Sequence, residues 1–261
     1  MEGFVRIVSL VPSLTETLFA LGLTSDEVVG RTAWCIHPKN IVDDVMVIGG
    51  TKTPNLGKIR NLNPDLIVMD KEENPLTVYQ TLKKEGYTIF VSEVTSPNDV
   101  PKMLHDLGKM CNKESVGKEL ASRCRESLDS LAQRESTTRT VPLIWHEPLM
   151  AVSPSKYPGA ILTAVGFDVV DTEPQGNGYP EISIREFIEH EIELILLTSE
   201  PHNFSTEEGI SIAEKIVSAG GVSPEVIHID GEDLTWFGSR TASALSKLAD
   251  FRTRVFETMG K

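Results

Sequence analysis

The chain has 261 residues, 40% of them hydrophobic, and a formal net charge of −13. This length and apolar content suffice for one large domain or two of ordinary size. The acidic balance argues against nucleic-acid binding, which needs clustered lysine and arginine to contact phosphates.

Short apolar runs predict strands, and helical patterns separate them. In chain order the predicted strands are 6–10, 28–31, 66–70, 88–91, 141–145, 169–171, 193–198 and 226–229. Continuous β-branched runs that alternate with helices are typical of parallel sheets covered on both faces. The predicted fold class is therefore α/β.

The stretch 96–140 has no strand signal. An apolar stripe at helical spacing predicts one helix from Glu114 to Gln133; it consists of Val116, Leu120, Cys124, Leu128 and Leu131. A helix of that length spans roughly 30 Å, the width of a small domain. We therefore predict an N-terminal α/β lobe (1–95), a helical connector with a long backbone helix (96–140) and a C-terminal α/β lobe (141–261).

One pattern occurs in both predicted lobes. Pro12-Ser13 and Pro154-Ser155 each precede an apolar run that ends at a glycine. Further on, the spacing from Leu56 to Leu66 equals that from Ile184 to Leu194. A repeated α/β unit predicts two similar Rossmann-like lobes, and a cleft between lobes is a common site for small ligands.

The first residues and the cysteines indicate the cellular compartment in which the protein works. The first residues show no charged leader followed by an apolar core. The cysteines are odd in number and lack CxxC spacing, so neither a disulfide framework nor a zinc site is indicated. We expect a cytoplasmic protein, or a periplasmic or cell-surface one if a leader has been removed. No apolar run approaches the roughly eighteen residues of a membrane span.

Two predicted strands are followed by a tryptophan and a histidine. Trp34 and His37 follow strand 28–31, and Trp145 and His146 end or follow strand 141–145. A neutral imidazole is a common metal ligand, so His37 or His146 is a candidate axial ligand of a bound metal chelate. The alternative is a histidine that only hydrogen-bonds a ligand or a loop carbonyl.

Carboxylates follow the strongest strand of each lobe. Asp70 ends strand 66–70 and Glu72 follows it, and Glu200 and His202 follow strand 193–198. The carboxyl ends of parallel strands carry the binding groups of α/β proteins. These carboxylates could serve as acid and base, but charged loop residues are more often only solvated. No glycine-rich phosphate loop, GxSxG elbow or HExxH helix occurs, so we expect binding without turnover and no required cofactor.

Several segments together resemble a known family. They are residues 6–16 (RIVSLVPSLTE), 29–32 (VGRT), 48–51 (IGGT), 55–56 (NL), 63–67 (NPDLI) and 233–240 (DLTWFGSR). In this order they resemble the cobalamin-binding proteins of ABC importers, in the helical-backbone metal receptor superfamily with its class III substrate-binding fold. The resemblance implies two α/β lobes joined by one long helix, with a corrin, siderophore or haem held between them.

The resemblance also implies ligand-contacting positions. His37 stands where the family has a tyrosine and Tyr179 where it has a tryptophan, while Thr51, Asp70 and Met150 replace aromatic residues. The C-terminal loop with Trp236, Phe237 and Arg240 matches. The candidate ligand-binding residues are, in full, Ser13, Trp34, His37, Thr51, Asp70, Trp145, His146, Met150, Tyr179, Glu200, His202, Trp236, Phe237 and Arg240.

Docking on a permease is the second implication. Family members use one exposed glutamate on each lobe, and Gly57 and Arg185 occupy those positions here. A one-residue shift would bring in Lys58 or Glu186, which restores only one glutamate. We therefore expect a small-ligand binding protein for cobalamin or another metal chelate that does not dock on a permease. The alternatives are a transport receptor for cobalamin, siderophore or haem whose leader is missing, and an enzyme or ligand chaperone that uses Asp70, Glu72 and Glu200.

Overall fold

The structure is a computed structural model that describes residues 5–131 and 138–260. The contacts divide the chain into two compact units. Unit 1 contains the residues up to Val94, then Asp99–Arg125 and Phe237–Arg240; unit 2 contains Thr95–Asn98, the residues from Glu126 to Trp236 and those from Thr241 on. The C-terminal segment Phe237–Arg240 thus packs with the N-terminal unit, which the predicted boundaries did not include.

Unit 1 is built on a fully parallel sheet. Its strands are β1 (Ile7–Ser9), β2 (Val28–Arg31), β3 (Met46–Val47), β4 (Leu66–Asp70) and β5 (Ile89–Ser92). Their order is β3-β2-β1-β4-β5. Strands β1 and β4 are buried along their whole length, as expected for strands covered on both faces.

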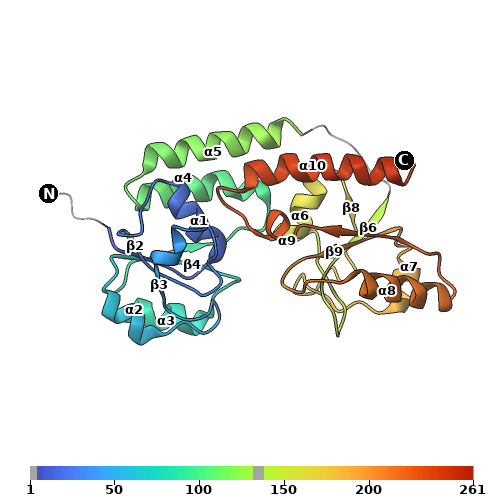
Figure 1. The fold of residues 1–261 in the computed structure, drawn as a ribbon, viewed down its shortest axis with the longest axis horizontal. Helices are drawn as coiled ribbons and strands as arrows, with labels where there is room; N and C mark the ends of the chain where they lie inside the picture. The colour runs from blue at the N-terminus through green and yellow to red at the C-terminus, as the bar shows by residue number, and fades with distance from the viewer. Residues whose placement is uncertain (1–4, 132–137, 261) are drawn as a thin grey trace. The chain divides into compact units, whose positions relative to one another are not determined.

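Helices cover both faces of this sheet. They are α1 (Pro12–Ala20), α2 (Leu56–Leu62), α3 (Leu76–Lys84) and α4 (Val100–Met110), with a 3₁₀ turn at Val42–Asp44. A second 3₁₀ turn, Pro97–Asp99, precedes α4 and lies mostly in unit 2. Figure 1 shows α2 and α3 on one face and α1 and α4 on the other. On the α2/α3 face, Ile59 and Leu82 join Ile67 and Met69 in one buried cluster, so burial of apolar side chains fixes these helices on the sheet.

The predicted long helix is α5 (Glu114–Asp129), shorter at its carboxyl end than expected. The predicted end at Gln133 lies outside the described residues. Helix α5 runs from unit 1 into unit 2, since the division falls after Arg125. Its start packs closely on α4: a Cβ atom on Gly117 would lie 2.8 Å from the Leu104 carbonyl oxygen, and one on Gly108 would lie 2.8 Å from the Gly117 Cα.

Unit 2 has a mixed sheet. Its strands are β6 (Arg139–Trp145), β7 (Met150–Ala151), β8 (Asp168–Val169), β9 (Leu194–Thr198) and β10 (Glu225–Ile229). The order is β10-β9-β6-β7, with β8 also paired to β6. Only β7 is antiparallel to its neighbour, and neither it nor the short β3 was predicted.

The helices of unit 2 are α6 (Tyr157–Ala164), α7 (Ile184–Glu189), α8 (Thr206–Ser218), α9 (Gly231–Thr235) and α10 (Thr241–Thr258). Figure 1 shows α7 and α8 together on one face of the sheet. Phe187 of α7 and Ile212 and Ile216 of α8 pack there against Ile195 and Leu197 of β9. The sequence prediction of two α/β units with parallel strands is confirmed.

The internal repeat is visible in both units. Helix α2 begins at Leu56 and β4 at Leu66, just as α7 begins at Ile184 and β9 at Leu194. The order β2-β1-β4-β5 in unit 1 corresponds to β8-β6-β9-β10 in unit 2. The two units therefore share the order of four parallel strands.

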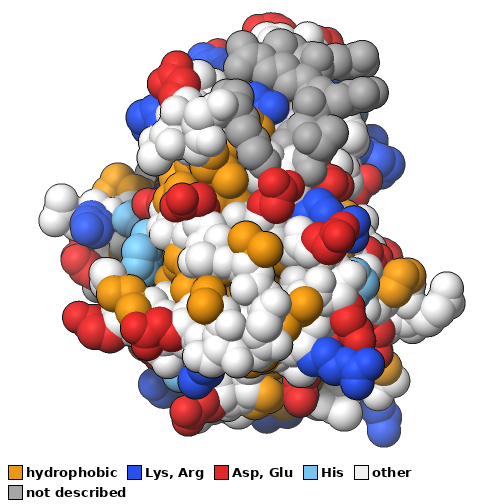
Figure 2. Space-filling model, turned by 90° about the vertical axis from the view of Figure 1, so that its right-hand side faces the viewer, with side chains coloured by type: hydrophobic (Ala, Val, Ile, Leu, Met, Phe, Trp, Pro, Cys, Tyr) orange, Lys and Arg blue, Asp and Glu red, His pale blue; other side chains and the backbone are white. Residues whose placement is uncertain are grey.

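The surface and the helices give two further observations. On the face in Figure 2, acidic and basic side chains are interspersed and apolar side chains reach the surface in small groups. Among the described residues, every helix is too short or too polar to cross a lipid bilayer.

Candidate functional site

In each unit the strand order reverses at one point. In unit 1 the chain places β2 on one side of β1 and β4 on the other, and in unit 2 it places β8 and β9 on opposite sides of β6. Ligands of open α/β sheets bind outside the carboxyl ends of the strands at such switch points. The loops that follow β1, β4, β6 and β9 are therefore the candidate binding loops.

In unit 2 the two loops bring three titratable side chains together. His146 follows β6, His202 follows β9, and Glu208 lies in the first turn of α8. The Nδ1 atom of His146 lies 3.1 Å from Glu208 Oε1, and Nε2 of His202 lies 2.9 Å from the same oxygen. All three side chains are partly exposed, between 23% and 29%. Two imidazoles thus share one carboxylate oxygen at the unit 2 switch point.

Aromatic rings surround these histidines. The two imidazoles stack with centroids 5.8 Å apart, and Trp145 meets His202 edge-on at 5.9 Å. Phe204, which is buried, meets His202 edge-on at 4.6 Å. The predicted residues Trp145, His146 and His202 therefore lie together, and the Trp145 ring remains 42% exposed.

Sequence reasoning missed Glu208, although its position carries a signal. Ser205 caps α8, its Oγ accepting a hydrogen bond from the Glu208 backbone N–H at 3.1 Å, and the Ser205 backbone N–H donates to Glu208 Oε2 at 2.6 Å. This is the capping box that Ser-x-x-Glu before a helical pattern predicts. The backbone hydrogen bond from Ser205, aided by His202, lowers the pKa of the Glu208 carboxyl.

Glu200, which also follows β9, contacts α9. Its Oε1 accepts a hydrogen bond from the Thr235 hydroxyl at 2.9 Å. Burial raises the pKa of the Glu200 carboxyl, with a smaller contribution from the negative charge of Glu232. A Cβ atom on Gly231 would lie 2.4 Å from the Glu200 side chain, so α9 approaches Glu200 closely because a glycine begins it.

Met150 and Tyr179 also belong to unit 2. Met150 pairs with Trp145 in the β6–β7 hairpin and bridges to Glu181. The Lys156 ammonium lies over the Tyr179 ring, 5.1 Å from its centroid, in a cation–π contact. Both residues are partly buried.

In unit 1, Asp70 is a buried carboxylate at the end of β4. Its Oδ1 accepts hydrogen bonds from the backbone N–H groups of Glu72 and Glu73, and its Oδ2 accepts one from the Ser92 hydroxyl at 2.6 Å. Burial raises the pKa of this carboxyl, and this effect is larger than the lowering that the hydrogen bonds cause. Its oxygens thus organise the loop after β4.

Asn74 connects that loop to another candidate. Its side-chain oxygen accepts from the Asp70 backbone N–H at 2.8 Å, and its amide donates to the Thr51 carbonyl at 3.1 Å. Thr51 is buried, and so is Ser13 in the first turn of α1. Asp70 and Thr51 therefore lie in one hydrogen-bonded loop region, whose connecting residue sequence reasoning did not identify.

Trp34 and His37 lie in the loop after β2. The Trp34 side chain is 67% exposed, and its indole nitrogen lies 3.9 Å from the place that a Cβ atom on Gly50 would take. His37 is partly buried. Trp34 thus presents a large apolar ring to solvent at the carboxyl-end side of the unit 1 sheet.

The C-terminal loop is fixed on α1. Arg240 forms a two-pronged ion pair with Glu16, at 3.0 Å and 2.9 Å. The Ser239 backbone N–H donates to the Thr17 hydroxyl at 3.1 Å. Phe237 is buried in unit 1, and Trp236, the last residue of unit 2 before this loop, is buried as well. Of the three tryptophans, Trp34 and Trp145 are the exposed ones.

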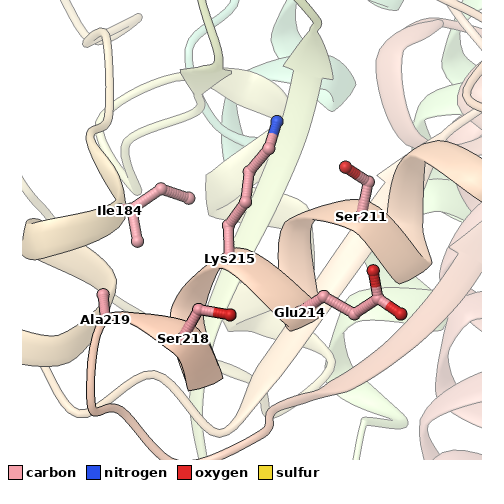
Figure 3. Close-up of a pocket in the computed structure, with 6 residues that line it drawn as sticks. All are labelled: Ile184, Ser211, Glu214, Lys215, Ser218 and Ala219. Carbon is pink, nitrogen blue, oxygen red and sulfur yellow. The ribbon is translucent and has the colours of Figure 1, made fainter.

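A surface hollow lies elsewhere in unit 2. It is lined by Ile184 at the start of α7 and by residues of α8 and its end, as Figure 3 shows. The lining residues are Ile184, Ser211, Glu214, Lys215, Ser218 and Ala219. None of the predicted site residues is among them, so the hollow is separate from the candidate binding loops.

Known proteins are similar to this chain in sequence. A vitamin B12-binding protein of Vibrio parahaemolyticus is 26% identical over 201 residues, which cover 76% of this chain and 72% of the relative. An uncharacterized ABC transporter substrate-binding lipoprotein of Bacillus subtilis, YvrC, is 30% identical over 135 residues, which cover 51% of this chain and 42% of that protein.

Solved structures show the same fold. The periplasmic vitamin B12-binding protein BtuF of Vibrio cholerae superposes with a TM-score of 0.77 at 20% identity, covering 94% of this chain and 95% of that one. The periplasmic haem-binding protein HutB of the same species has a TM-score of 0.77 at 17% identity, covering 95% and 99%. The sequence profile of the family described as periplasmic binding protein matches residues 7–219. Most of the chain fits that profile, and the chain therefore belongs to the periplasmic binding protein family.

Proposed function

We propose that this protein binds a planar metal chelate, of the cobalamin or haem type, through the loops at the carboxyl ends of its strands. The observation that carries the proposal is the exposed indole in each unit, Trp34 at 67% and Trp145 at 42% exposure, each close in sequence to a histidine. A large aromatic ring stacks well on a flat ligand and is costly to leave in water. Relatives named for vitamin B12 and solved structures titled as binding vitamin B12 or haem support this ligand class.

The chemistry we propose is binding without turnover. Asp70, the most buried candidate acid, uses both oxygens to hold backbone and hydroxyl donors, which leaves it a structural role. The Arg240 guanidinium is similarly engaged by Glu16. The exposed indole rings would then contact the faces of the chelate, with an axial nitrogen from His37 or His146.

An absorbance titration tests this proposal. Purified protein is titrated with cyanocobalamin and, separately, with haemin, and the same titrations are run on His37→Ala, Trp34→Ala and Trp145→Ala. We expect a saturable spectral change with one ligand and at least a tenfold weaker affinity in one of the tryptophan variants, because a stacking ring contributes about 1.4 kcal/mol or more. Val222→Ala is the matched control, since Val222 is 87% exposed and lies between α8 and β10. Equal affinity in all variants would contradict the assignment of the loops.

A transport receptor is the second candidate, favoured by the relative named as an ABC transporter substrate-binding lipoprotein. Against that role, we propose that this protein does not dock on a permease through paired glutamates. Gly57 and Arg185 occupy the positions of the family's two docking glutamates, and the Arg185 guanidinium is paired with Glu189 at 2.6 Å. The neighbouring Glu186 uses its carboxylate to cap α7 on Ser183.

Fractionation of cells that express the native gene, with the first thirty or so codons read, separates the two roles. Export with a cleaved leader would favour the transport receptor. Retention in the cytoplasm would favour a binding protein that works without a permease.

A further inference from the structure

We propose that His146, His202 and Glu208 of unit 2 bind a divalent transition-metal ion directly, such as Zn²⁺ or Co²⁺. The site takes a bare ion and lies within one unit. It shares His146 with the candidate axial ligands of the metal chelate proposed above, so the tests below use His202→Gln and Glu208→Gln, two residues that the chelate proposal does not need.

The geometry supports this assignment. Both histidine nitrogens lie about 3 Å from one oxygen, at 3.1 Å and 2.9 Å, and the three ligand atoms all lie within 4.8 Å of one another. Around Zn²⁺, with bonds of about 2.0–2.1 Å, tetrahedral ligands lie about 3.3–3.4 Å apart. Two of the three distances thus need to open by only a few tenths of an ångström, within the reach of ordinary side-chain adjustment.

The ligand types select the metal class. Two imidazoles and one carboxylate suit Zn²⁺, Co²⁺, Ni²⁺ and Fe²⁺, whereas Mg²⁺ and Ca²⁺ prefer oxygen ligands alone. The side chains are 23%, 29% and 23% exposed, so an ion has access. Three protein ligands leave at least one coordination position for water or another ligand, as in catalytic and exchangeable zinc sites.

The ligands are held by rigid elements. His146 and His202 follow β6 and β9, which pair in parallel with Leu143 opposite Leu197 near these ends. The backbone N–H of His202 donates to the Ile144 carbonyl at 3.3 Å. Glu208 keeps Oε1 toward the imidazoles because its Oε2 accepts the Ser205 N–H. Hydrogen bonds that orient a ligand in this way raise metal affinity.

A hydrogen-bonded group that never binds metal is the competing interpretation. Each imidazole can donate an N–H to Glu208, and such a group needs no ion. The two interpretations differ in whether an added ion binds with saturation and whether that binding needs all three residues. Among the described residues this is the one group of three or more such side chains within ligand distance of each other.

The test is calorimetric titration of the full chain, first treated with a chelator and dialysed into metal-free buffer, with Zn²⁺ as the probe. We expect one ion per chain. His202→Gln and Glu208→Gln should each lower the affinity at least tenfold. Glutamine retains a capping side chain at the third helical position, so Glu208→Gln keeps α8 capped while removing the charged ligand. Far-ultraviolet circular dichroism of each variant checks the fold.

His105→Gln is the matched control. His105 also lies beside a glutamate, Glu114, at 3.4 Å, but Lys118 shares that carboxylate at 2.8 Å. This variant should bind Zn²⁺ as the wild type does. Equal loss in His105→Gln would show that the ion binds scattered surface histidines.

A second readout reports the place of binding. Trp145 lies 5.9 Å from His202, so Cu²⁺ or Ni²⁺ bound at the site should quench its fluorescence, and Trp145→Phe should lose most of the quenching. Co²⁺ should give visible absorption bands that disappear in His146→Gln. Absence of saturable Zn²⁺ binding, or unchanged affinity in both His202→Gln and Glu208→Gln, would overturn the proposal whatever the cobalamin titration gives.

Discussion

The contact of α4 with α5 gives the sharpest stability prediction. In Gly117→Ala the new Cβ atom would lie 2.8 Å from the Leu104 carbonyl oxygen and 3.0 Å from the Gly108 Cα, whereas ordinary contact begins at 3.4 Å. The helices would have to separate by about 0.5 Å in a close-packed region. Overpacking of this kind costs about 1–3 kcal/mol, and alanine returns about 0.5–1 kcal/mol of helix propensity. The net loss of unfolding free energy is therefore about 1 kcal/mol, and at most about 2.5 kcal/mol.

Urea denaturation followed by circular dichroism measures this loss. Gly57→Ala is the control, because Gly57 is exposed in α2 and its Cβ atom would meet only the Asn55 side-chain oxygen, at 3.2 Å. We expect that variant to be at least as stable as the wild type, with a gain of up to about 1 kcal/mol from helix propensity. In the double variant Gly108→Ala/Gly117→Ala the two losses should not add, since both Cβ atoms enter one contact. A Gly117→Ala protein at least as stable as the wild type would refute the close helix contact.

Further predictions concern single residues. Gly238→Ala should cost about 1–3 kcal/mol, because Gly238 has φ +118° and its Cβ atom would lie 2.3 Å from the Thr17 hydroxyl; urea midpoints measure it. Burial raises the pKa of Asp70 above its ordinary value of 3.8, so the folded state binds this proton more tightly than the unfolded chain does. The wild-type protein should therefore lose stability relative to Asp70→Asn as the pH rises from about 4 through that raised pKa. Equal pH dependence of the two urea midpoints would contradict this. Burial also raises the pKa of Cys111 to about 12 and of Cys124 to about 11, so a thiol reagent at about pH 8 should label them only after unfolding.

Much of the fold follows from local sequence signals. Apolar runs such as 66–70 and 194–198 predict the buried strands, because strands covered on both faces have no polar side. The equal spacing of the two repeats fixed helix and strand starts in both units. Strands β3 and β7 escaped prediction, since two residues carry no periodicity.

The candidate site was only partly predictable. Strand ends directed attention to Trp145, His146 and His202, which the structure brings together. Glu208 was missed because its Ser-x-x-Glu signal predicts a helix cap, and only the tertiary fold turns the second carboxylate oxygen toward the histidines. The placement of Phe237–Arg240 in unit 1 likewise depends on contacts with α1, a helix that precedes this segment by more than two hundred residues.

Equilibrium dialysis of the wild-type protein against cyanocobalamin, and in parallel against haemin, tests the proposed function most directly. We predict that one of these ligands binds with saturation at one per chain, and that it protects Trp34 or Trp145 fluorescence from a soluble quencher. Retention of neither ligand above a protein-free control would contradict the binding of a planar metal chelate.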